Sequence, residues 1–199
     1  MIIDVELEKN EILKRYRKLL LLAKKSRDDL DKKQIRKAFN VALEAHKEMR
    51  RKSGEPYIYH PIAVAQIVAE EMGLGTTSIV SALLHDTVED TDVTPILITK
   101  MFGVDVADIV EGLTDISLPE DGNRAKRKSI DRMHSANAST EAQFVKCADI
   151  IDNSWDIAEN DLSFAKVYKS EVFLLLHALT KVKHTEIWEQ AMQSVELMP

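Results

Sequence analysis

Apolar side chains recur at helical spacing along most of the chain. In residues 8–26, the apolar residues mostly lie three or four positions apart, which puts them on one face of a helix: Ile12, Leu13, Tyr16, Leu19 and Leu20. Similar spacing predicts further helices over residues 33–49, 61–72, 77–86, 95–103, 104–115, 124–135, 140–156, 162–182 and 185–197. No segment shows the strict alternation of apolar and polar residues that indicates a half-buried strand. The pattern therefore predicts an all-α fold, an irregular multi-helix bundle.

Residues that start or stop helices mark several of these boundaries. Thr94 followed by Pro95 predicts an N-cap and a proline at the first helical position. Gly73 and Gly75 predict the end of the helix that reaches residue 72. Loops are predicted over residues 53–56 and 116–123, where glycine, proline and polar residues gather.

Composition places the chain among single-domain globular proteins. Its 199 residues are 45% apolar and 30% charged, which is enough apolar material for one substantial core. The formal net charge of -6 argues against non-specific nucleic-acid binding, although a locally basic site can still bind an anionic small molecule. Cys147 is the only cysteine, so an intrachain disulfide is excluded and a reducing, cytoplasmic setting is expected. Neither a signal peptide nor a membrane span is expected.

The dipeptide His85-Asp86 carries the strongest chemical signal. It ends the apolar run of residues 79–84, where an imidazole and a carboxylate are costly to bury unless both are paired. A lone pair of this kind is more often a surface feature at a helix end. Glu89 and Asp90 follow four residues later, so a continuing helix places three carboxylates and one imidazole on one face. Such a cluster repels itself without a cation, which favours a divalent metal.

Two further segments place ligand residue types inside apolar surroundings. His60 follows an aromatic stretch, and Asp149 lies in an apolar helical run with Asn153 one turn later. Together with His85 and Asp86, they provide two imidazoles and two carboxylates. This donor set suits Mn²⁺, and also Fe²⁺, Zn²⁺ or Co²⁺, with positions left for water and substrate. Spacing alone does not bring the three segments together in space.

Two other reactive residue types are interpreted as structural. His46 lies at helical spacing with the apolar side chains of its segment, which favours a core histidine with satisfied hydrogen bonds over a ligand. Cys147 has no base or basic cluster beside it in the sequence, which is typical of a small core residue.

Three stretches resemble a known family. Residues 51–65, Arg-Lys-Ser-Gly-Glu-Pro-Tyr-Ile-Tyr-His-Pro-Ile-Ala-Val-Ala, resemble the signature of the RelA/SpoT-type HD hydrolase family. So do residues 82–92, Ala-Leu-Leu-His-Asp-Thr-Val-Glu-Asp-Thr-Asp, and residues 145–153, Val-Lys-Cys-Ala-Asp-Ile-Ile-Asp-Asn. The resemblance covers residues 34–155. Residues 118–128 are similar, with a short insertion, to a Leu-Pro-Lys-x-Glu-Arg-Lys segment of the family's small stand-alone alarmone hydrolases.

The resemblance implies a role for each candidate residue. One metal ion per chain, Mn²⁺ in the family, would be held by His60, His85, Asp86 and Asp149. Glu89 and Asp90 would orient and deprotonate the attacking water. The nucleotide and its phosphates would be contacted by Arg51, Lys52, Ser53, Arg124 and Asn153. The family's late phosphate contacts do not align cleanly, and the candidates there are Lys166, Tyr168 and Lys169.

The implied reaction removes the 3′-pyrophosphate of guanosine tetra- or pentaphosphate (ppGpp or pppGpp), giving GDP or GTP and pyrophosphate. Two alternatives stay open: an HD-type phosphohydrolase acting on NADPH or another nucleotide, and a binding module that senses the alarmone without turnover. The implied organisation is a single HD hydrolase domain over residues 1–199. It would consist of an N-terminal helix in 1–32, a metal-site core in 33–156 and C-terminal helices in 157–199. The oligomeric state is left open.

Departures from the family pattern lie around the nucleotide rather than the metal. Trp155 stands where many members carry arginine, Glu48-Met49 replaces Gly-Gln, and Lys126 replaces an acidic residue. These changes bear on base preference and affinity more than on hydrolysis. Positive charge for the phosphates is expected from Arg51, Lys52, Arg124 and residues 126–128.

Overall fold

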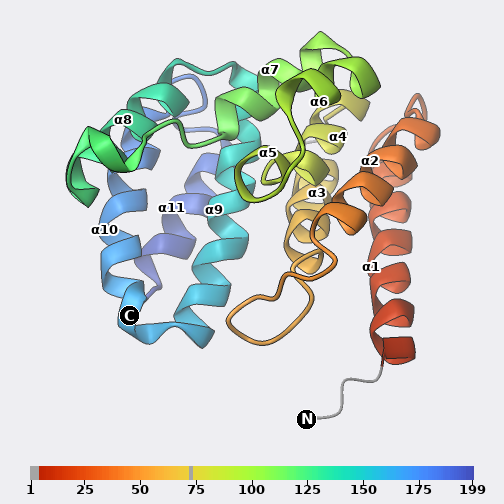
Figure 1. Ribbon diagram of the computed structural model, residues 1–199, viewed down its shortest axis with the longest axis horizontal. Helices are drawn as coiled ribbons and strands as arrows, with labels where there is room; N and C mark the ends of the chain where they lie inside the picture. Colours follow the sequence, from red (N-terminus) through yellow and green to blue (C-terminus); the bar gives the residue numbers. More distant parts are fainter. Residues whose placement is uncertain (1–4, 72–73) are drawn as a thin grey trace.

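Figure 1 shows the computed structural model, which describes residues 5–71 and 74–199. The helices are α1 (Val5–Ser26), α2 (Lys32–Ala45), α3 (Tyr59–Glu71), α4 (Thr76–Leu84), α5 (Thr87–Asp90), α6 (Pro95–Phe102), α7 (Val104–Leu113), the 3-10 helix η1 (Pro119–Asp121), α8 (Arg124–Asn137), α9 (Thr140–Asn160), α10 (Leu162–Ala178) and α11 (Glu186–Glu196). The described residues contain no strand, only an isolated β-bridge between Arg50 and Pro56. The prediction of an all-α fold is confirmed. None of the described helices combines the length and apolarity needed to cross a membrane.

α9 is the central element of the fold and joins two clusters of buried side chains. One cluster comes mainly from α1 to α4, α6 and α7, and α9 contributes Ala142, Val145 and Ala148 to it. The other comes mainly from α10 and α11, with Cys147 and Ile150 from α9. In Figure 1, α9 accordingly lies between the α3–α4 side and the α10–α11 side. Cys147 is buried there, and its interpretation as a core residue is confirmed.

Polar caps start several helices. Thr94 accepts a hydrogen bond from the backbone N–H of Leu97, and Pro95 opens α6, so the predicted start of this helix is confirmed. Asn123 caps α8 and Ser139 caps α9 through similar side-chain contacts. These two caps fix the beginnings of helices that line the functional cavity described below.

α7 approaches the turn between α8 and α9 closely at Gly112. A Cβ atom on this residue would lie 2.8 Å from Cβ of Ala138 and 3.4 Å from Cβ of Ala142. The first distance is shorter than carbon atoms can pack without a shift of the backbone. Glycine therefore permits the N-terminal half of the bundle to pack onto the beginning of α9.

Two helices end earlier than their apolar spacing predicts. α2 ends at Ala45 rather than at position 49, because the backbone turns at His46. α10 ends at Ala178 rather than at position 182. Leu179 and Val182 are fully buried in the turn that follows, so the apolar spacing continues past the end of the helix.

The predicted helix over residues 77–86 is broken at its chemically important end. α4 ends at Leu84, and α5 is a separate single turn that follows it. The predicted loop over residues 116–123 contains the short helix η1. The helix end predicted at Met72 and Gly73 lies outside the described residues.

Candidate metal centre

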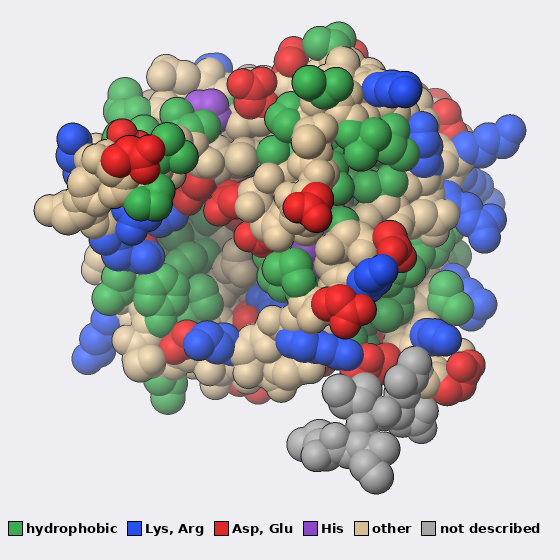
Figure 2. Space-filling model, in the orientation of Figure 1, with side chains coloured by type: hydrophobic (Ala, Val, Ile, Leu, Met, Phe, Trp, Pro, Cys, Tyr) green, Lys and Arg blue, Asp and Glu red, His purple; other side chains and the backbone are tan. Residues whose placement is uncertain are grey.

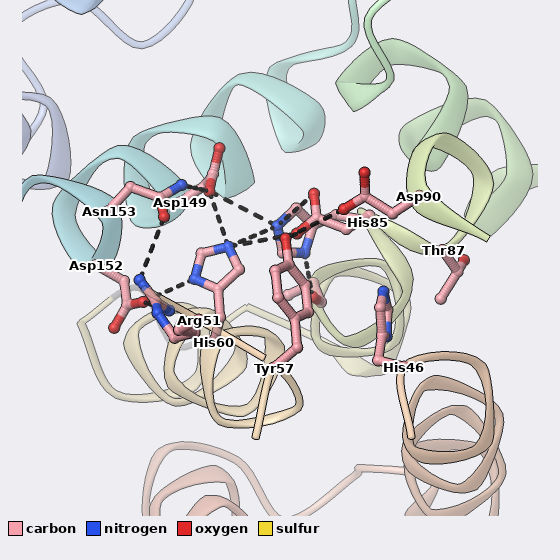
Figure 3. Close-up of polar contacts among 12 residues, drawn as sticks. His46, Arg51, Tyr57, His60, His85, Thr87, Asp90, Asp149, Asp152 and Asn153 are labelled. Carbon is pink, nitrogen blue, oxygen red and sulfur yellow. Dashed lines mark hydrogen bonds and ion pairs between the residues drawn. The ribbon is translucent and has the colours of Figure 1, made fainter. Parts of the chain in front are cut away.

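Segments that are distant in the sequence meet at a group of imidazoles and carboxylates (Figure 3). His60 lies in the first turn of α3, and Asp149 lies in the middle of α9. His85 and Asp86 lie at the break between α4 and α5. Asp86 is partly buried, and the other three residues are buried. The structure thus brings together all four predicted metal ligands, whose role as ligands stays a prediction.

The nitrogen and oxygen atoms of these side chains surround a common point. Nε2 of His60 and Nε2 of His85 lie 3.2 Å apart. Oδ1 of Asp149 is 3.2 Å from Nε2 of His60 and 3.6 Å from Nε2 of His85. Asp86 places Oδ1 3.1 Å from Nε2 of His85 and Oδ2 3.5 Å from Nε2 of His60. Ligand atoms of His60, His85 and Asp86 all lie within 4.8 Å of one another, close enough for one metal ion to contact all three.

The hydrogen bonds of the two imidazoles leave their Nε2 atoms free for a cation. Nδ1 of His85 lies 2.8 Å from the carbonyl oxygen of Ala82, which can only accept, so Nδ1 donates. Nδ1 of His60 lies 2.7 Å from Oδ2 of Asp152 and donates in the same way. In the neutral rings, both Nε2 lone pairs then face each other and the neighbouring carboxylates. A divalent cation removes this repulsion, so the residues fit a divalent metal site.

Without a metal ion, protons balance the negative charge of the cluster. Burial lowers the pKa of His85, but Asp86 and Asp149 outweigh this effect and raise that pKa to about 10. Burial also opposes the charged form of His60, whose pKa is nevertheless raised by its bonds to Asp149 and Asp152. Burial disfavours the charged form of Asp86, yet His85 holds the pKa of that carboxyl well below its ordinary value.

Metal binding should therefore release protons and become tighter as the pH rises. An imidazole whose metal-free pKa is about 10 is protonated at neutral pH, and the metal ion must displace that proton. Below this pKa, the affinity should rise by up to about tenfold per pH unit for each proton displaced. Isothermal titration with Mn²⁺ in two buffers of different ionisation enthalpy counts the protons. Zero protons released, with an affinity that ignores pH, would contradict binding at these imidazoles.

Glu89 and Asp90, predicted to activate water, lie in α5 beside the cluster. Their predicted place near His85 and Asp86 assumed one helix that continues past His85. That assumption is wrong, because α5 is a separate turn. Oε2 of Glu89 accepts a hydrogen bond from the backbone N–H of Asp115 at 3.1 Å. Although both carboxylates are open to the cavity, the surrounding protein displaces part of their water and raises the pKa of each, with Asp86 adding its negative charge. A raised pKa suits a carboxylate that accepts a proton near neutral pH.

Tyr57 connects this pair of carboxylates to the predicted ligands. Its hydroxyl donates to Oδ2 of Asp86 at 2.6 Å, and Oδ2 of Asp90 lies 3.2 Å away. Burial raises the pKa of Tyr57 and the carboxylates raise it further, so the hydroxyl keeps its proton. The sequence interpretation missed this role, and the only signal for it was the position of Tyr57 within the family-like stretch of residues 51–65.

His46 is buried in the core, as predicted, and its ring packs against the ring of Tyr57. The two rings stack with their centroids 4.9 Å apart. Nδ1 of His46 lies 2.9 Å from the carbonyl oxygen of Ala42, whereas its Nε2 has no hydrogen-bond partner among the described residues. Burial lowers the pKa of the ring and favours its neutral form. The interpretation as a core residue is confirmed, but the expectation that both nitrogens are hydrogen-bonded is wrong.

A cavity of about 320 Å³ opens beside the cluster and is lined by residues of α5, α8, α9 and α10. Figure 2 shows a hollow on this face, with Lys and Arg side chains at its edge. Asp86, Asp149, Glu89 and Asp90 line the cavity. Its basic lining residues are Arg124, Lys128, Arg132 and Lys146. Four cationic side chains near a candidate metal centre suit a phosphorylated small molecule.

Only some of the predicted nucleotide contacts line this cavity. Asn153 does so, and its Nδ2 donates to Oδ1 of Asp149 at 2.7 Å. Arg124 lines it too, with its guanidinium held by Glu171 at 2.6 and 2.8 Å. Lys169 lies outside the lining, because its ammonium group donates to two carbonyl oxygens at the end of α11, at 3.1 and 2.6 Å. Its place there is that of a helix C-cap.

Three more predicted nucleotide contacts lie outside the lining of the cavity: Arg51, Lys52 and Ser53. Arg51 is largely buried in ion pairs with Asp152 at 2.7 Å and Asp156 at 3.0 Å. Asp152 in turn accepts from Nδ1 of His60. Arg51 is therefore linked through Asp152 to His60, one of the predicted metal ligands. The sequence interpretation missed Asp152, because nothing within its own segment indicates that it faces residues of two other segments.

Replacing Asp152 with Asn should weaken divalent-ion binding by about 10–100-fold. The carboxylate fixes the proton on Nδ1 of His60 and thereby aims Nε2 at the cluster, and an amide is a poorer acceptor. Titration calorimetry with Mn²⁺ gives the affinity. Asp156→Asn is the matched control, since Asp156 shares Arg51 but makes no contact with His60 among the described interactions. Equal losses in both variants would assign the effect to Arg51 instead.

Known proteins match the chain over the region of the cluster. The HD domain family matches residues 38–153. Guanosine-3′,5′-bis(diphosphate) 3′-pyrophosphohydrolase MESH1 of Xenopus tropicalis is 44% identical over 127 residues, which cover 62% of this chain and 69% of that protein. A probable GTP pyrophosphokinase of Mycobacterium leprae (strain TN) is 41% identical over 120 residues, which are 60% of this chain but 15% of that protein.

Solved structures share the fold. The structure of a metazoan ortholog of SpoT that hydrolyzes ppGpp and plays a role in starvation responses superimposes with a TM-score of 0.73 at 26% identity, covering 83% of this chain and 94% of that one. Protein lmo0812 of Listeria monocytogenes EGD-e gives a TM-score of 0.59 at 25% identity, covering 72% and 95% of the two chains. The all-α fold and the buried imidazoles and carboxylates define a helical protein with a candidate divalent-metal centre. The chain belongs to the HD domain family, which confirms the predicted type of bundle.

Proposed function

We propose that this protein is a Mn²⁺-dependent hydrolase that removes the 3′-pyrophosphate of ppGpp or pppGpp and releases GDP or GTP together with pyrophosphate. The observation that carries the proposal is the meeting of two imidazoles and two carboxylates at one point, beside Glu89 and Asp90. The likeness to the MESH1 pyrophosphohydrolase of Xenopus tropicalis, at 44% identity over 69% of that protein, supports the choice of reaction.

The donor set supports a divalent ion, and the choice of Mn²⁺ comes from the resemblance to RelA/SpoT-type hydrolases. Mixed nitrogen and oxygen ligands also suit Fe²⁺, Co²⁺ and Zn²⁺. His60, His85, Asp86 and Asp149 would hold the ion. When bound, it would polarise a phosphate oxygen and lower the pKa of water beside it.

In this proposal, Glu89 and Asp90 would accept the proton that the attacking water loses. Both line the cavity together with Asp86, and the pKa of each is raised toward the range of a general base. The water oxygen forms a bond to the phosphorus attached to O3′ of the ribose, the bond between that phosphorus and O3′ breaks, and O3′ takes up a proton. The hydroxyl of Tyr57, which donates its proton to Asp86, also lies 3.2 Å from Oδ2 of Asp90.

Basic side chains supply the positive charge that a polyphosphate needs next to so many carboxylates. Lys146 lines the cavity, and its ammonium group lies 3.3 Å from Oδ2 of Asp149. Burial lowers the pKa of Lys146, but Asp149 and other carboxylates outweigh this effect, so it remains charged. Arg124 and Lys128 add charge from α8, and Asn153 offers an amide to the nucleotide.

Pyrophosphate release from ppGpp, measured with Mn²⁺ and again after chelation with EDTA, tests the proposal. We expect release only with the metal, and GDP as the nucleotide product. Parallel assays with NADPH and GTP address another HD-type specificity: orthophosphate from these compounds, with no pyrophosphate from ppGpp, would overturn the proposal. Tight ppGpp binding with Mn²⁺ and no product would instead identify a binding module.

The single-domain organisation over residues 1–199 and a cytoplasmic location belong to the same proposal. The family match over residues 38–153 supports the metal-site core proposed for residues 33–156. The buried free thiol of Cys147 fits a reducing compartment.

A further inference from the structure

The four basic side chains of the cavity differ in their partners. Glu171 holds Arg124, Asp115 holds Lys128, and Asp149 holds Lys146. Arg132 is different: the only side-chain contact recorded for its guanidinium is with Oγ of Ser129 at 3.2 Å, and no carboxylate of the described residues lies within 4.0 Å of it. One cationic group of the cavity is therefore left without a negative partner.

Asp131, the acid next to Arg132 in the sequence, forms no ion pair with Arg132 among the described interactions. Asp131 is buried and accepts hydrogen bonds from the backbone N–H groups of Ile116 and Ser117 and from the hydroxyl of Ser117. Its carboxylate is thus committed to the loop that precedes η1, and Nζ of Lys128 lies 4.0 Å from its Oδ2. Arg132 itself is half-buried in the cavity lining, so its charge is neither freely hydrated nor neutralised.

Helical spacing places Arg132 in line with the other basic residues of α8. Arg124, Lys128 and Arg132 are each four residues apart, which puts them on one face over successive turns, and all three line the cavity. A guanidinium is a planar fork of donors that matches the oxygens of a phosphate group, and it cannot lose its charge. The unpaired member of this row is therefore the side chain best prepared to bind an anion.

We propose that Arg132 binds a phosphate group of the nucleotide, either one of the 5′-phosphates or the 3′-pyrophosphate. This inference rests on the proposed function. More carboxylates than basic side chains line the cavity, so a substrate with four or five phosphates needs a cation that is not already paired. Arg124 and Lys128 must break their ion pairs with Glu171 and Asp115 before they can bind a phosphate group with their full charge. Arg132 has no such ion pair to break among the described interactions.

Arg132→Met tests the proposal, with Arg132→Lys as the conservative variant. Arg17→Met is the matched control, because Arg17 is exposed on α1 and lies outside the cavity lining. Two substrates are compared with Mn²⁺: ppGpp, and guanosine 3′-diphosphate, which lacks the 5′-phosphates. We expect Arg132→Met to lower kcat/KM for ppGpp by about ten- to a hundredfold, mainly through KM, and Arg132→Lys to recover part of the loss.

The two substrates distinguish the two phosphate groups. A loss confined to ppGpp assigns Arg132 to the 5′-phosphates, and an equal loss with both substrates assigns it to the 3′-pyrophosphate. Each outcome supports phosphate binding when Arg132→Lys recovers activity. Values within about twofold of the native protein for both substrates would overturn the proposal. So would a loss that Arg132→Lys does not relieve at all.

Equilibrium binding keeps this test separate from that of the proposed function. Titration calorimetry measures GDP, guanosine and inorganic pyrophosphate on the native chain and on Arg132→Met. Weaker binding of GDP or pyrophosphate, with guanosine unchanged, supports the assignment even if ppGpp is not hydrolysed, an outcome that would end the proposed function alone. The role of Arg132 would be overturned if Arg132→Met bound each of the three compounds with the native affinity. It would also be overturned if guanosine binding weakened as much as the binding of GDP or pyrophosphate.

Discussion

Asp149→Ala is expected to abolish divalent-ion binding and to reduce pyrophosphate release from ppGpp by at least about 10³-fold. Oδ1 of Asp149 lies within 3.2 Å of Nε2 of His60 and 3.6 Å of Nε2 of His85, so this carboxylate closes the cluster from the α9 side. Without it, the two imidazoles and Asp86 form an incomplete site. Titration calorimetry with Mn²⁺ measures the loss of binding, and a pyrophosphate assay measures the loss of turnover.

The design must separate loss of the site from loss of the fold. Asp149 also pairs with the buried Lys146, so its removal leaves that ammonium group less well compensated. Asp149→Asn keeps the volume and removes the charge, and Asp108→Ala on the exposed face of α7 is the matched control. Circular dichroism reports the helical content of each variant. Native Mn²⁺ affinity and native turnover in a folded Asp149→Ala protein would refute the ligand assignment.

Helix starts and the overall class of fold could be predicted from the sequence, because they depend on local chemistry. The cap at Thr94 needs only its own oxygen and the N–H of Leu97. The ends of α2 and α10 were predicted too late, because apolar spacing records burial and not hydrogen bonding. Leu179 and Val182 are as buried as helical core residues, yet they follow the end of α10.

The ligand types of the site could be predicted for a similar reason. A histidine and aspartates inside apolar runs indicate a partner that satisfies them, and the resemblance supplied the way in which the segments combine. The partners of charged side chains could not be predicted, because they come from other segments. Arg51 was expected at the nucleotide but pairs with Asp152 and Asp156, and Lys169 was expected there but caps α11.

The lack of an ion-pair partner at Arg132 among the described residues could not be predicted from the sequence either. In the sequence it lies in a basic stretch of α8 whose members look equivalent. Only the folded structure shows that Glu171 and Asp115 neutralise Arg124 and Lys128 while Arg132 keeps its charge free. The number of basic residues around a site is therefore a weaker guide to anion binding than the number left unpaired.

Glu89→Gln is expected to lower kcat for ppGpp hydrolysis by about 10²–10⁴-fold while leaving Mn²⁺ affinity within a fewfold of native. The amide keeps the shape of the side chain but cannot accept a proton from water. The predicted metal ligands are untouched, because Glu89 contacts the backbone N–H of Asp115 and none of the four cluster side chains among the described interactions. Initial rates at saturating ppGpp, together with Mn²⁺ titration, measure both quantities.

The pH profile gives this prediction a second readout. Partial burial raises the pKa of Glu89 and of Asp90, so both take up protons at a higher pH than free carboxyls do. A base acts only when it is deprotonated, so the native rate should fall as the pH drops through these raised pKa values. The residual rate of Glu89→Gln should no longer show the fall that protonation of Glu89 causes at acidic pH. Glu111→Gln, on the exposed surface of α7, should keep the native pH profile. If Glu89→Gln kept the native kcat and the native acidic limb, proton transfer would have to be assigned to Asp90, and Asp90→Asn would then have to show the loss.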